Sequence, residues 1–237
     1  MRKVAHELLI SDAHMLCIQN LSIFAQGNQI LNDFSCAFLP GSITYITGPN
    51  GVGKTALLRL IAGIKKLTHG KVTYHDRDIA DIRKPYALYI GHKLGLDPQL
   101  TVAKQLEAFT QGGMTQMLVP AAIEYLKLHD VLDTPISLLS AGYAKKVALS
   151  KCLLSDIDLW LLDEVEANLD EANTNVLHKL LASKADAGGI VFIASHGPTR
   201  MPKAQKLNLA YWSLSVTGTV AEETTMRDIF ATPQKVK

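Results

Sequence analysis

One stretch of the sequence decides the fold: Gly48-Pro49-Asn50-Gly51-Val52-Gly53-Lys54-Thr55. It follows a β-branched run at Ile43–Thr47, which predicts a strand, and it opens Lys54–Ile64, whose apolar spacing predicts a helix. The pattern is that of a phosphate-binding loop, whose inward N–H groups and helix N-terminus form an anion site. We expect the Lys54 ammonium to reach the β- and γ-phosphates of a nucleotide and the Thr55 hydroxyl to ligate Mg²⁺. The stretch therefore predicts a nucleoside triphosphate site in an α/β protein.

Composition excludes several other classes of protein. The chain has 237 residues, of which 48% are hydrophobic and 19% charged, so it is neither disordered nor collagen-like. Its formal net charge of +2 argues against a dedicated nucleic-acid or anionic-membrane binder. Three cysteines without a CxxC pair give no zinc motif and favour a reducing, cytosolic location. No apolar run approaches the roughly 20 residues of a membrane span, and charged residues interrupt the signal-like run at Leu8–Ile10.

The order of strands and helices predicts how the chain is organised. Strand-like runs alternate with helical ones before about residue 93, three helical stretches follow without a strand, and strong apolar strands then resume. This pattern predicts an α/β core with a helical insertion at about residues 93–155. Residues 1–14 are predicted to be an N-terminal extension, and translation could start at Met1 or Met15. The predicted strands are Leu16–Phe24, Ile30–Leu39, Ile43–Thr47, Gly70–Tyr74, Ala87–Ile90, Leu159–Leu162 and Gly189–Ala194; the predicted helices of the insertion are Thr101–Gln111, Val119–Leu128 and Ala144–Leu154.

Two further strand ends carry side chains that suit phosphoryl transfer. The apolar run Leu159–Leu162 leads into Asp163 and Glu164, which places both carboxylates at the edge of the sheet beside the phosphate loop. Asp163 is predicted to hold Mg²⁺ through water and Glu164 to polarise the attacking water. His196 ends the next buried run and could bond the γ-phosphate. Glu164, His196 and Lys54 form the predicted catalytic set, and Thr55 and Asp163 form the predicted magnesium site. An ordinary Asp-Glu turn and a strand-end histidine are the structural alternatives.

A third motif lies shortly before the acidic strand. The stretch Leu139-Ser140-Ala141-Gly142-Tyr143 resembles the LSGGQ signature of the ATP-binding cassette ATPases. At a helix N-terminus, the Ser140 hydroxyl, Ala141 and the Gly142 N–H could bind a γ-phosphate, although a plain serine N-cap has the same pattern. In that family the signature serves the nucleotide bound by the opposite subunit. The resemblance implies a phosphate-loop ATPase with an antiparallel β subdomain, an inserted helical subdomain and a head-to-tail dimer that sandwiches ATP and Mg²⁺.

Other landmarks of the same family occur in order along residues 15–237, which the resemblance makes one nucleotide-binding domain. Ala167-Asn168-Leu169-Asp170 resembles the D-loop that crosses the dimer interface. Phe24 is placed like the aromatic residue that stacks on adenine, although a core phenylalanine would look the same. His92 stands where most members have a coupling glutamine. Tyr143 and Val165 depart from the family pattern, which puts the turnover rate rather than the activity in doubt.

A softer resemblance points to a subgroup. The passage Tyr89-Ile90-Gly91-His92, continued by Leu100-Thr101-Val102, resembles the "GH…LT" passage of cytochrome c maturation ATPases, the haem exporter ATP-binding proteins. The resemblance implies a peripheral subunit on the cytoplasmic face of the inner membrane that energises a CcmB-like integral membrane transporter subunit. We expect no direct haem binding, because the sequence has no CxxCH and its eight histidines are scattered, and no nucleic-acid binding, because it has no excess of basic charge. Three alternatives stay open: a small cassette for another cargo, a soluble cassette acting on nucleic acid or ribosomes, and a degenerate regulatory cassette. In each of the transporter readings, the membrane partner rather than this chain would select the cargo.

Overall fold

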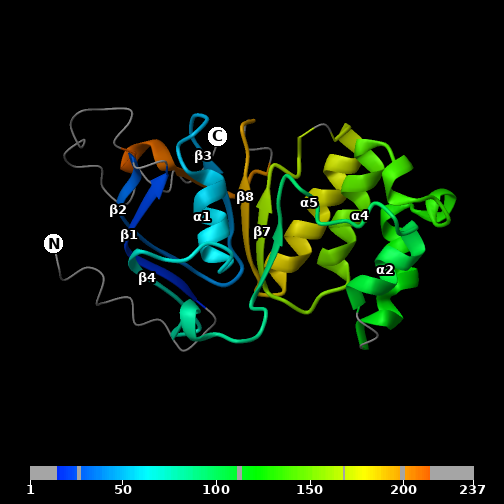
Figure 1. Cartoon of the computed structure of the whole chain (residues 1–237), viewed down its shortest axis with the longest axis horizontal. Coiled ribbons are helices and arrows are strands. Elements are labelled where there is room, and N and C mark those ends of the chain that lie inside the picture. Colours follow the sequence, from blue (N-terminus) through cyan, green and yellow to red (C-terminus); the bar gives the residue numbers. More distant parts are fainter. Residues whose placement is uncertain (1–14, 26–27, 111–113, 168, 198–200, 214–237) are drawn as a thin grey trace, which may run out of the picture.

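The computed structural model describes residues 15–25, 28–110, 114–167, 169–197 and 201–213. Two sheets organise them (Figure 1): an antiparallel sheet in the order β2-β1-β4-β5 and a parallel sheet in the order β6-β7-β8-β3-β9. The antiparallel strands are β1 (Leu16–Ala25), β2 (Asn28–Phe38), β4 (His69–Tyr74) and β5 (Arg77–Asp78). The parallel strands are β3 (Ile43–Thr47), β6 (Ala87–Ile90), β7 (Leu159–Asp163), β8 (Ile190–Ala194) and β9 (Gln205–Asn208).

The parallel sheet is covered on both faces, which explains why all residues of β7 and β8 are buried. Leu159 and Leu161 of β7 join a core with α1 (Lys54–Ile61) and the antiparallel sheet. The alternate residues Trp160 and Leu162 join a second core with α4 (Ala141–Leu153) and α5 (Glu171–Asp186). The helices α1 and α4 therefore lie on opposite faces of the parallel sheet (Figure 1).

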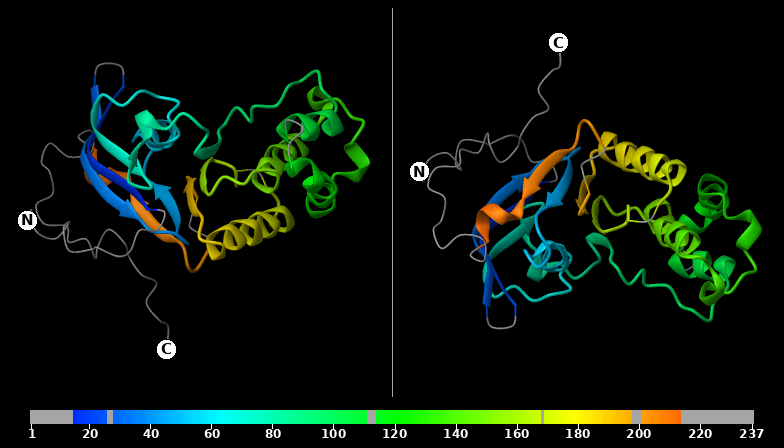
Figure 2. Two further views of the ribbon diagram at one scale, coloured as in Figure 1. Left: turned by 90° about the horizontal axis from the view of Figure 1, so that it is seen from below. Right: turned by 90° about the horizontal axis from the view of Figure 1, so that it is seen from above.

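A helical lobe, defined here as the segment from α2 through α4, connects β6 to β7 and has a core of its own. It lies at the end of the molecule opposite the antiparallel sheet (Figure 2), and its helix α4 packs with α5 against the parallel sheet. Besides α4, its helices are α2 (Val102–Thr110), η3 (Met114–Leu118), α3 (Val119–Leu126), η4 (His129–Val131) and η5 (Ile136–Leu138). The remaining short helices, η2 (Ile79–Asp81) and η6 (Leu209–Trp212), lie outside the lobe. None of the helices in the described part of the chain combines the length and the apolar character needed to cross a membrane.

Several predicted boundaries are wrong, for identifiable reasons. The helix predicted to reach residue 64 ends at Ile61, because Gly63 takes a left-handed conformation with φ of 71°. The helix predicted to end at residue 128 ends at Leu126, where Lys127 is left-handed with φ of 52°. The helix predicted from residue 144 begins at Ala141, because the Ser140 side chain caps it.

The sequence did not predict β5, β9 or α5. β9 is an edge strand in which only Leu207 is buried, so it lacks the apolar run of β7 and β8. β5 has only two residues, and both are polar. The N-terminal extension predicted at residues 1–14 lies outside the described residues.

Candidate active site

The phosphate loop joins the buried strand β3 to α1, and its conformation depends on glycine. Gly48 has a φ of +134° and a Cβ there would lie 3.0 Å from the Val52 side chain; Gly53 has a φ of +107°. Val52 itself is buried in the core, and its side chain packs beside Gly48. Pro49, Asn50 and Gly51 are exposed. The loop therefore presents its backbone to solvent around a cradle that phosphate oxygens can fill.

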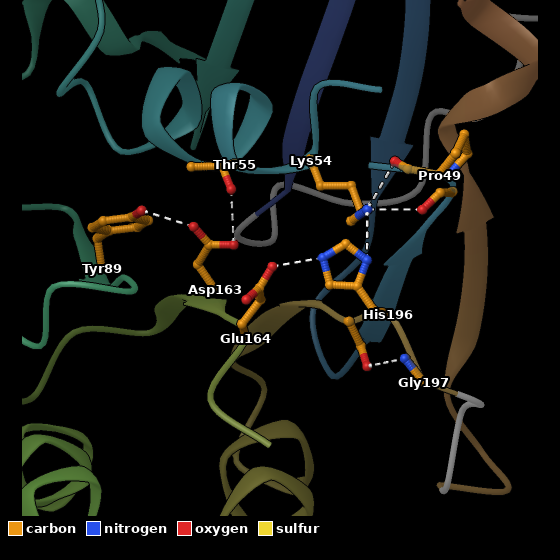
Figure 3. Close-up of polar contacts among 10 residues, drawn as sticks. Pro49, Lys54, Thr55, Tyr89, Asp163, Glu164, His196 and Gly197 are labelled. Carbon is orange, nitrogen blue, oxygen red and sulfur yellow. Dashed lines mark hydrogen bonds and ion pairs between the residues drawn. The ribbon is translucent and has the colours of Figure 1, made fainter. Parts of the chain in front are cut away.

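The Lys54 side chain is folded back into this cradle. Its Nζ donates to the carbonyl oxygens of Gly48 at 2.7 Å and Pro49 at 3.1 Å (Figure 3). Burial lowers the pKa of Lys54, and the charges of Glu164 and Asp163 oppose that shift. An ammonium held in the loop by two backbone oxygens is poised to contact a phosphate anion.

Two oxygen donors suited to Mg²⁺ lie beside the loop. Thr55 Oγ1 donates to Asp163 Oδ1 at 3.1 Å, and Asp163, the last residue of β7, is only 3% exposed. A hydroxyl and a carboxylate at this separation are hard oxygen ligands of the kind that Mg²⁺ prefers. The donor set therefore fits the predicted magnesium site.

The second oxygen of Asp163 is held by a residue that the sequence analysis missed. Tyr89 Oη, on β6, donates to Asp163 Oδ2 at 3.1 Å and accepts from Arg59 Nε at 3.3 Å. Burial raises the pKa of Tyr89, which keeps the phenol in its donating form. Arg59 and Tyr89 thus fix the orientation of the carboxylate from outside the site.

Glu164 directly follows β7 and has an unusual backbone. Its φ is +59°, and its N–H donates to Ala194 O at 3.0 Å, so the neighbouring strand β8 holds it in this left-handed conformation. Its Oε1 lies 2.6 Å from His196 Nε2, and His196 Nδ1 lies 3.3 Å from Lys54 Nζ (Figure 3). Because the Lys54 ammonium can only donate, Nδ1 is the acceptor and Nε2–H donates to the carboxylate.

These contacts bring the predicted catalytic residues together at one edge of the parallel sheet (Figure 3). The side chains of Glu164 and His196 are 33% and 45% exposed, so solvent water reaches the carboxylate. A carboxylate oriented by a neutral imidazole, next to an ammonium and a magnesium-type donor pair, can activate water against a bound phosphate.

The other predicted binding residues lie apart from this cluster. Ser140 Oγ accepts from Tyr143 N at 3.3 Å as the N-cap of α4, with Ala141 exposed and Gly142 partly exposed. Because α4 and α1 cover opposite faces of the parallel sheet, the structure does not bring this signature to the phosphate loop of its own chain.

Three further predicted residues are exposed. Phe24, on β1, is exposed and its ring lies 5.3 Å from that of His69. His92 is exposed after the end of β6. Asp170 caps α5 by accepting from Asn173 N at 2.7 Å.

Two residues that depart from the family pattern have structural roles. The Tyr143 ring lies 5.0 Å from Lys146 Nζ, and Val165 packs in the core beside α4 and α5. The neighbouring Lys145 Nζ donates to Ala167 O, which ties α4 to the segment that follows Glu164. Asn168, in the predicted D-loop, lies outside the described residues.

Comparisons with known proteins agree with this geometry. A family model described as "ABC transporter", that is ATP-binding cassette transporter, matches residues 31–167. The cytochrome c biogenesis ATP-binding export protein CcmA of Rickettsia bellii is 43% identical over 195 residues, covering 82% of this chain and 100% of that protein. The CcmA of Haemophilus influenzae is 34% identical over 205 residues, covering 84% of this chain and 97% of that protein.

The fold has close structural counterparts as well. An ABC transporter ATP-binding protein from Pyrococcus furiosus superimposes with a TM-score of 0.73 at 22% identity, covering 84% of this chain and 99% of that one. The predicted cassette fold and the recognition of the cytochrome c maturation subgroup are thereby confirmed. The chain belongs to the ATP-hydrolysing, ATP-binding proteins of the ABC transporter family, within the group of the CcmA export proteins.

Proposed function

We propose that this chain is the subunit that binds and hydrolyses MgATP to energise a separate membrane protein in cytochrome c biogenesis. The observation that carries the proposal is the continuous contact from Lys54 through His196 to Glu164, beside the Thr55–Asp163 pair. The printed names of its curated relatives supply the process, because they are cytochrome c biogenesis export proteins. We further propose that residues 15–237 act as one nucleotide-binding domain whose helical subdomain spans about residues 93–155.

The phosphate loop binds the nucleotide in this proposal. Its backbone N–H groups and the N-terminus of α1 contact the phosphates, and Lys54 exchanges its bonds to Gly48 O and Pro49 O for phosphate oxygens. Thr55 and Asp163, the latter through water, hold Mg²⁺, while Tyr89 keeps the carboxylate in place. When bound, the metal neutralises charge on the β- and γ-phosphates.

Glu164 is the general base. Its carboxylate accepts a hydrogen bond from the attacking water and takes its proton as the water oxygen bonds to the γ-phosphorus. The bond from the γ-phosphorus to the bridging oxygen breaks in the same step, and ADP leaves. The Nε2–H of His196 orients the carboxylate, and the Lys54 ammonium, bonded to Nδ1, keeps that imidazole in the required tautomer. When ATP is bound, the His196 imidazole can contact the γ-phosphate, and this contact is lost when the phosphate leaves.

Two copies of the chain complete each site. The Ser140 hydroxyl, Ala141 and the Gly142 N–H are placed at the start of α4, away from the phosphate loop of their own chain, where a second copy could use them. In the head-to-tail dimer, Asp170 lies at the interface, Phe24 stacks on adenine and His92 contacts the γ-phosphate side. The pairing of β1 with β2 supports this position for Phe24. Phe24 pairs with Gln29, and the next residue, Ile30, lies so close to Gly53 of the phosphate loop that a Cβ at Gly53 would contact it.

The helical lobe is the proposed contact with the CcmB-like membrane subunit. Leu138 is 74% exposed, and the adjacent Ser137 N–H donates to Pro98 O at 3.3 Å, so an apolar side chain lies beside the loop that leads from β6 into the lobe. A cytosolic helix of the partner docked there would follow the lobe when ATP closes the dimer. The chain would act peripherally at the cytoplasmic face of the inner membrane, without binding haem or nucleic acid.

The experiment replaces the native gene with a Lys54→Ala variant in the source organism. We expect loss of covalently haem-stained c-type cytochromes and persistence of b-type cytochromes, which need no such attachment. Normal c-type bands, with the variant protein present at native level by immunoblot, would contradict the proposed process and leave an ABC ATPase for another cargo. A Lys71→Ala strain is the matched control, because Lys71 is an exposed lysine on β4.

A further inference from the structure

A second polar cluster lies on the other face of the parallel sheet, behind the catalytic edge. Tyr45 Oη, on β3, donates to Glu166 Oε1 at 2.6 Å, and His178 Nε2, on α5, lies 2.7 Å from the same oxygen. Tyr45 is fully buried, and the side chains of Glu166 and His178 are only 10% and 16% exposed. Since an ionised carboxylate can only accept, the imidazole donates through Nε2–H. We call this cluster the Tyr45–Glu166–His178 triad.

The triad lies where three functional segments meet. Tyr45 is on the strand that runs into the phosphate loop, and Glu166 comes two residues after Glu164. His178 is on α5, which packs against β3 and β8. The carboxylate of Glu166 therefore ties the segment after the general base to the strand that carries the phosphate site.

The segment held by the triad has few other attachments among the described residues. Ala167 N donates to Glu164 O at 3.2 Å and Leu169 N donates to Glu166 O at 3.3 Å, so local turns shape it. Its bond to the helical lobe is the one from Lys145 Nζ to Ala167 O, and Val165 packs into the core. In the described part of this segment, the side chain of Glu166 makes a directional polar contact with the sheet, through Tyr45.

Directional contacts matter here because Glu164 has a left-handed backbone. Such a conformation persists only where the surroundings over-determine it. Upstream, the bond from Glu164 N to Ala194 O holds it; downstream, the triad holds the chain two residues later. An apolar residue in place of Glu166 would fill the same space without the free-energy cost of desolvating a carboxylate. It would not, however, fix the direction in which the segment after Glu164 leaves the sheet.

We propose that Glu166 is a positioning residue for ATP hydrolysis: through Tyr45 and His178 it fixes the backbone after Glu164 and so aims that carboxylate at the water. The inference rests on the proposed role of Glu164 as the general base. It predicts an effect on the chemical step rather than on ATP binding, because the Lys54, Thr55 and Asp163 contacts do not involve the triad.

The test compares ATP hydrolysis by the full chain carrying Tyr45→Phe, which removes one donor and keeps the ring, with the unaltered chain. We expect kcat and kcat/KM to fall equally, on the order of 10- to 100-fold, with the Kd for ATP unchanged. Glu166→Gln should lower kcat in the same way. The double variant Tyr45→Phe/Glu166→Gln should have a kcat no lower than that of the slower single variant, because the two residues act as a unit. His178→Gln provides a third variant if one of these does not fold.

Glu124→Gln is the matched control, because it removes the charge of another Glu–His pair. In that pair Glu124 and His129 are 2.8 Å apart, and both side chains are exposed on the helical lobe. Rates are expressed per ATP-binding site, so loss of folded protein does not count as loss of turnover. A triad that only stabilises the fold would lower the melting temperature and leave kcat per site unchanged, which overturns the inference. A Kd for ATP that weakens in step with kcat overturns it too.

The two proposals fail separately. If Glu164→Gln retains full turnover, the general-base assignment is wrong and the inference falls with it. If Glu164→Gln loses turnover but the triad variants keep it, only the positioning role is wrong.

Discussion

Replacing Glu164 by glutamine removes the proposed base with little other change. The glutamine amide has the size of the carboxyl group, and its oxygen can accept the hydrogen bond that His196 Nε2 donates at 2.6 Å. Glutamine and glutamate have the same unbranched Cβ, so both adopt the left-handed backbone of Glu164 at about the same cost. The substitution therefore isolates the loss of a proton acceptor.

The expected size of the effect follows from the site. A positioned general base contributes about 10²- to 10⁴-fold, so kcat should fall by that factor. The Kd for ATP should not rise, because the Lys54, Thr55 and Asp163 contacts remain. The Glu164–His196 pair is 33% and 45% exposed, so its loss should change the free energy of unfolding by no more than about 1 kcal/mol.

Three measurements test these expectations on purified protein: phosphate release at saturating MgATP, calorimetric titration with ATP and Mg²⁺, and sedimentation velocity. With hydrolysis blocked, the ATP-bound variant should sediment as a dimer, while the Glu124→Gln control should turn over normally. A variant that stays monomeric at saturating MgATP would refute the ATP sandwich. A fall in kcat of less than tenfold would refute the role of Glu164.

Other expectations concern the metal, the phosphate and the thiols. Lys54→Ala should abolish ATP binding as measured by calorimetry. Tyr89→Phe removes a donor to Asp163 and should weaken Mn²⁺ binding to the ATP complex about 10-fold or more, measured by electron paramagnetic resonance. Burial raises the pKa of Cys36 and Cys152 to about 12, so both thiols should resist alkylation at pH 8 until the protein unfolds. The native state disfavours both thiolates, so the contribution of these two thiols to the free energy of unfolding should be constant below about pH 8.5, the ordinary pKa of a thiol, and should fall as the pH rises above it. In urea titrations above that pH, the Cys36→Ala/Cys152→Ala variant should show a smaller fall in the free energy of unfolding.

Local motifs made much of this protein predictable. The phosphate loop, the run into Asp163 and Glu164, and the Ser140 cap each lie within one short segment, whose backbone geometry follows from glycine, a strand end or a helix start. The strands β7 and β8 were predicted because both faces of the sheet are covered, which requires continuous apolar runs. Neighbouring strand ends then placed His196 beside Glu164, as parallel strands require.

Tertiary structure decided what joins distant segments. Tyr89 meets Asp163 across 74 residues and Tyr45 meets Glu166 across 121, and in the sequence each tyrosine looks like an ordinary strand residue. Whether a tyrosine in a strand only packs or also donates depends on which carboxylate the fold brings to its hydroxyl. For the same reason the signature at Ser140 matched a family pattern in sequence, but only the fold places it across the sheet from its own phosphate loop. Local sequence sets backbone conformation; the partners of a buried polar side chain are set by the packing of the whole chain.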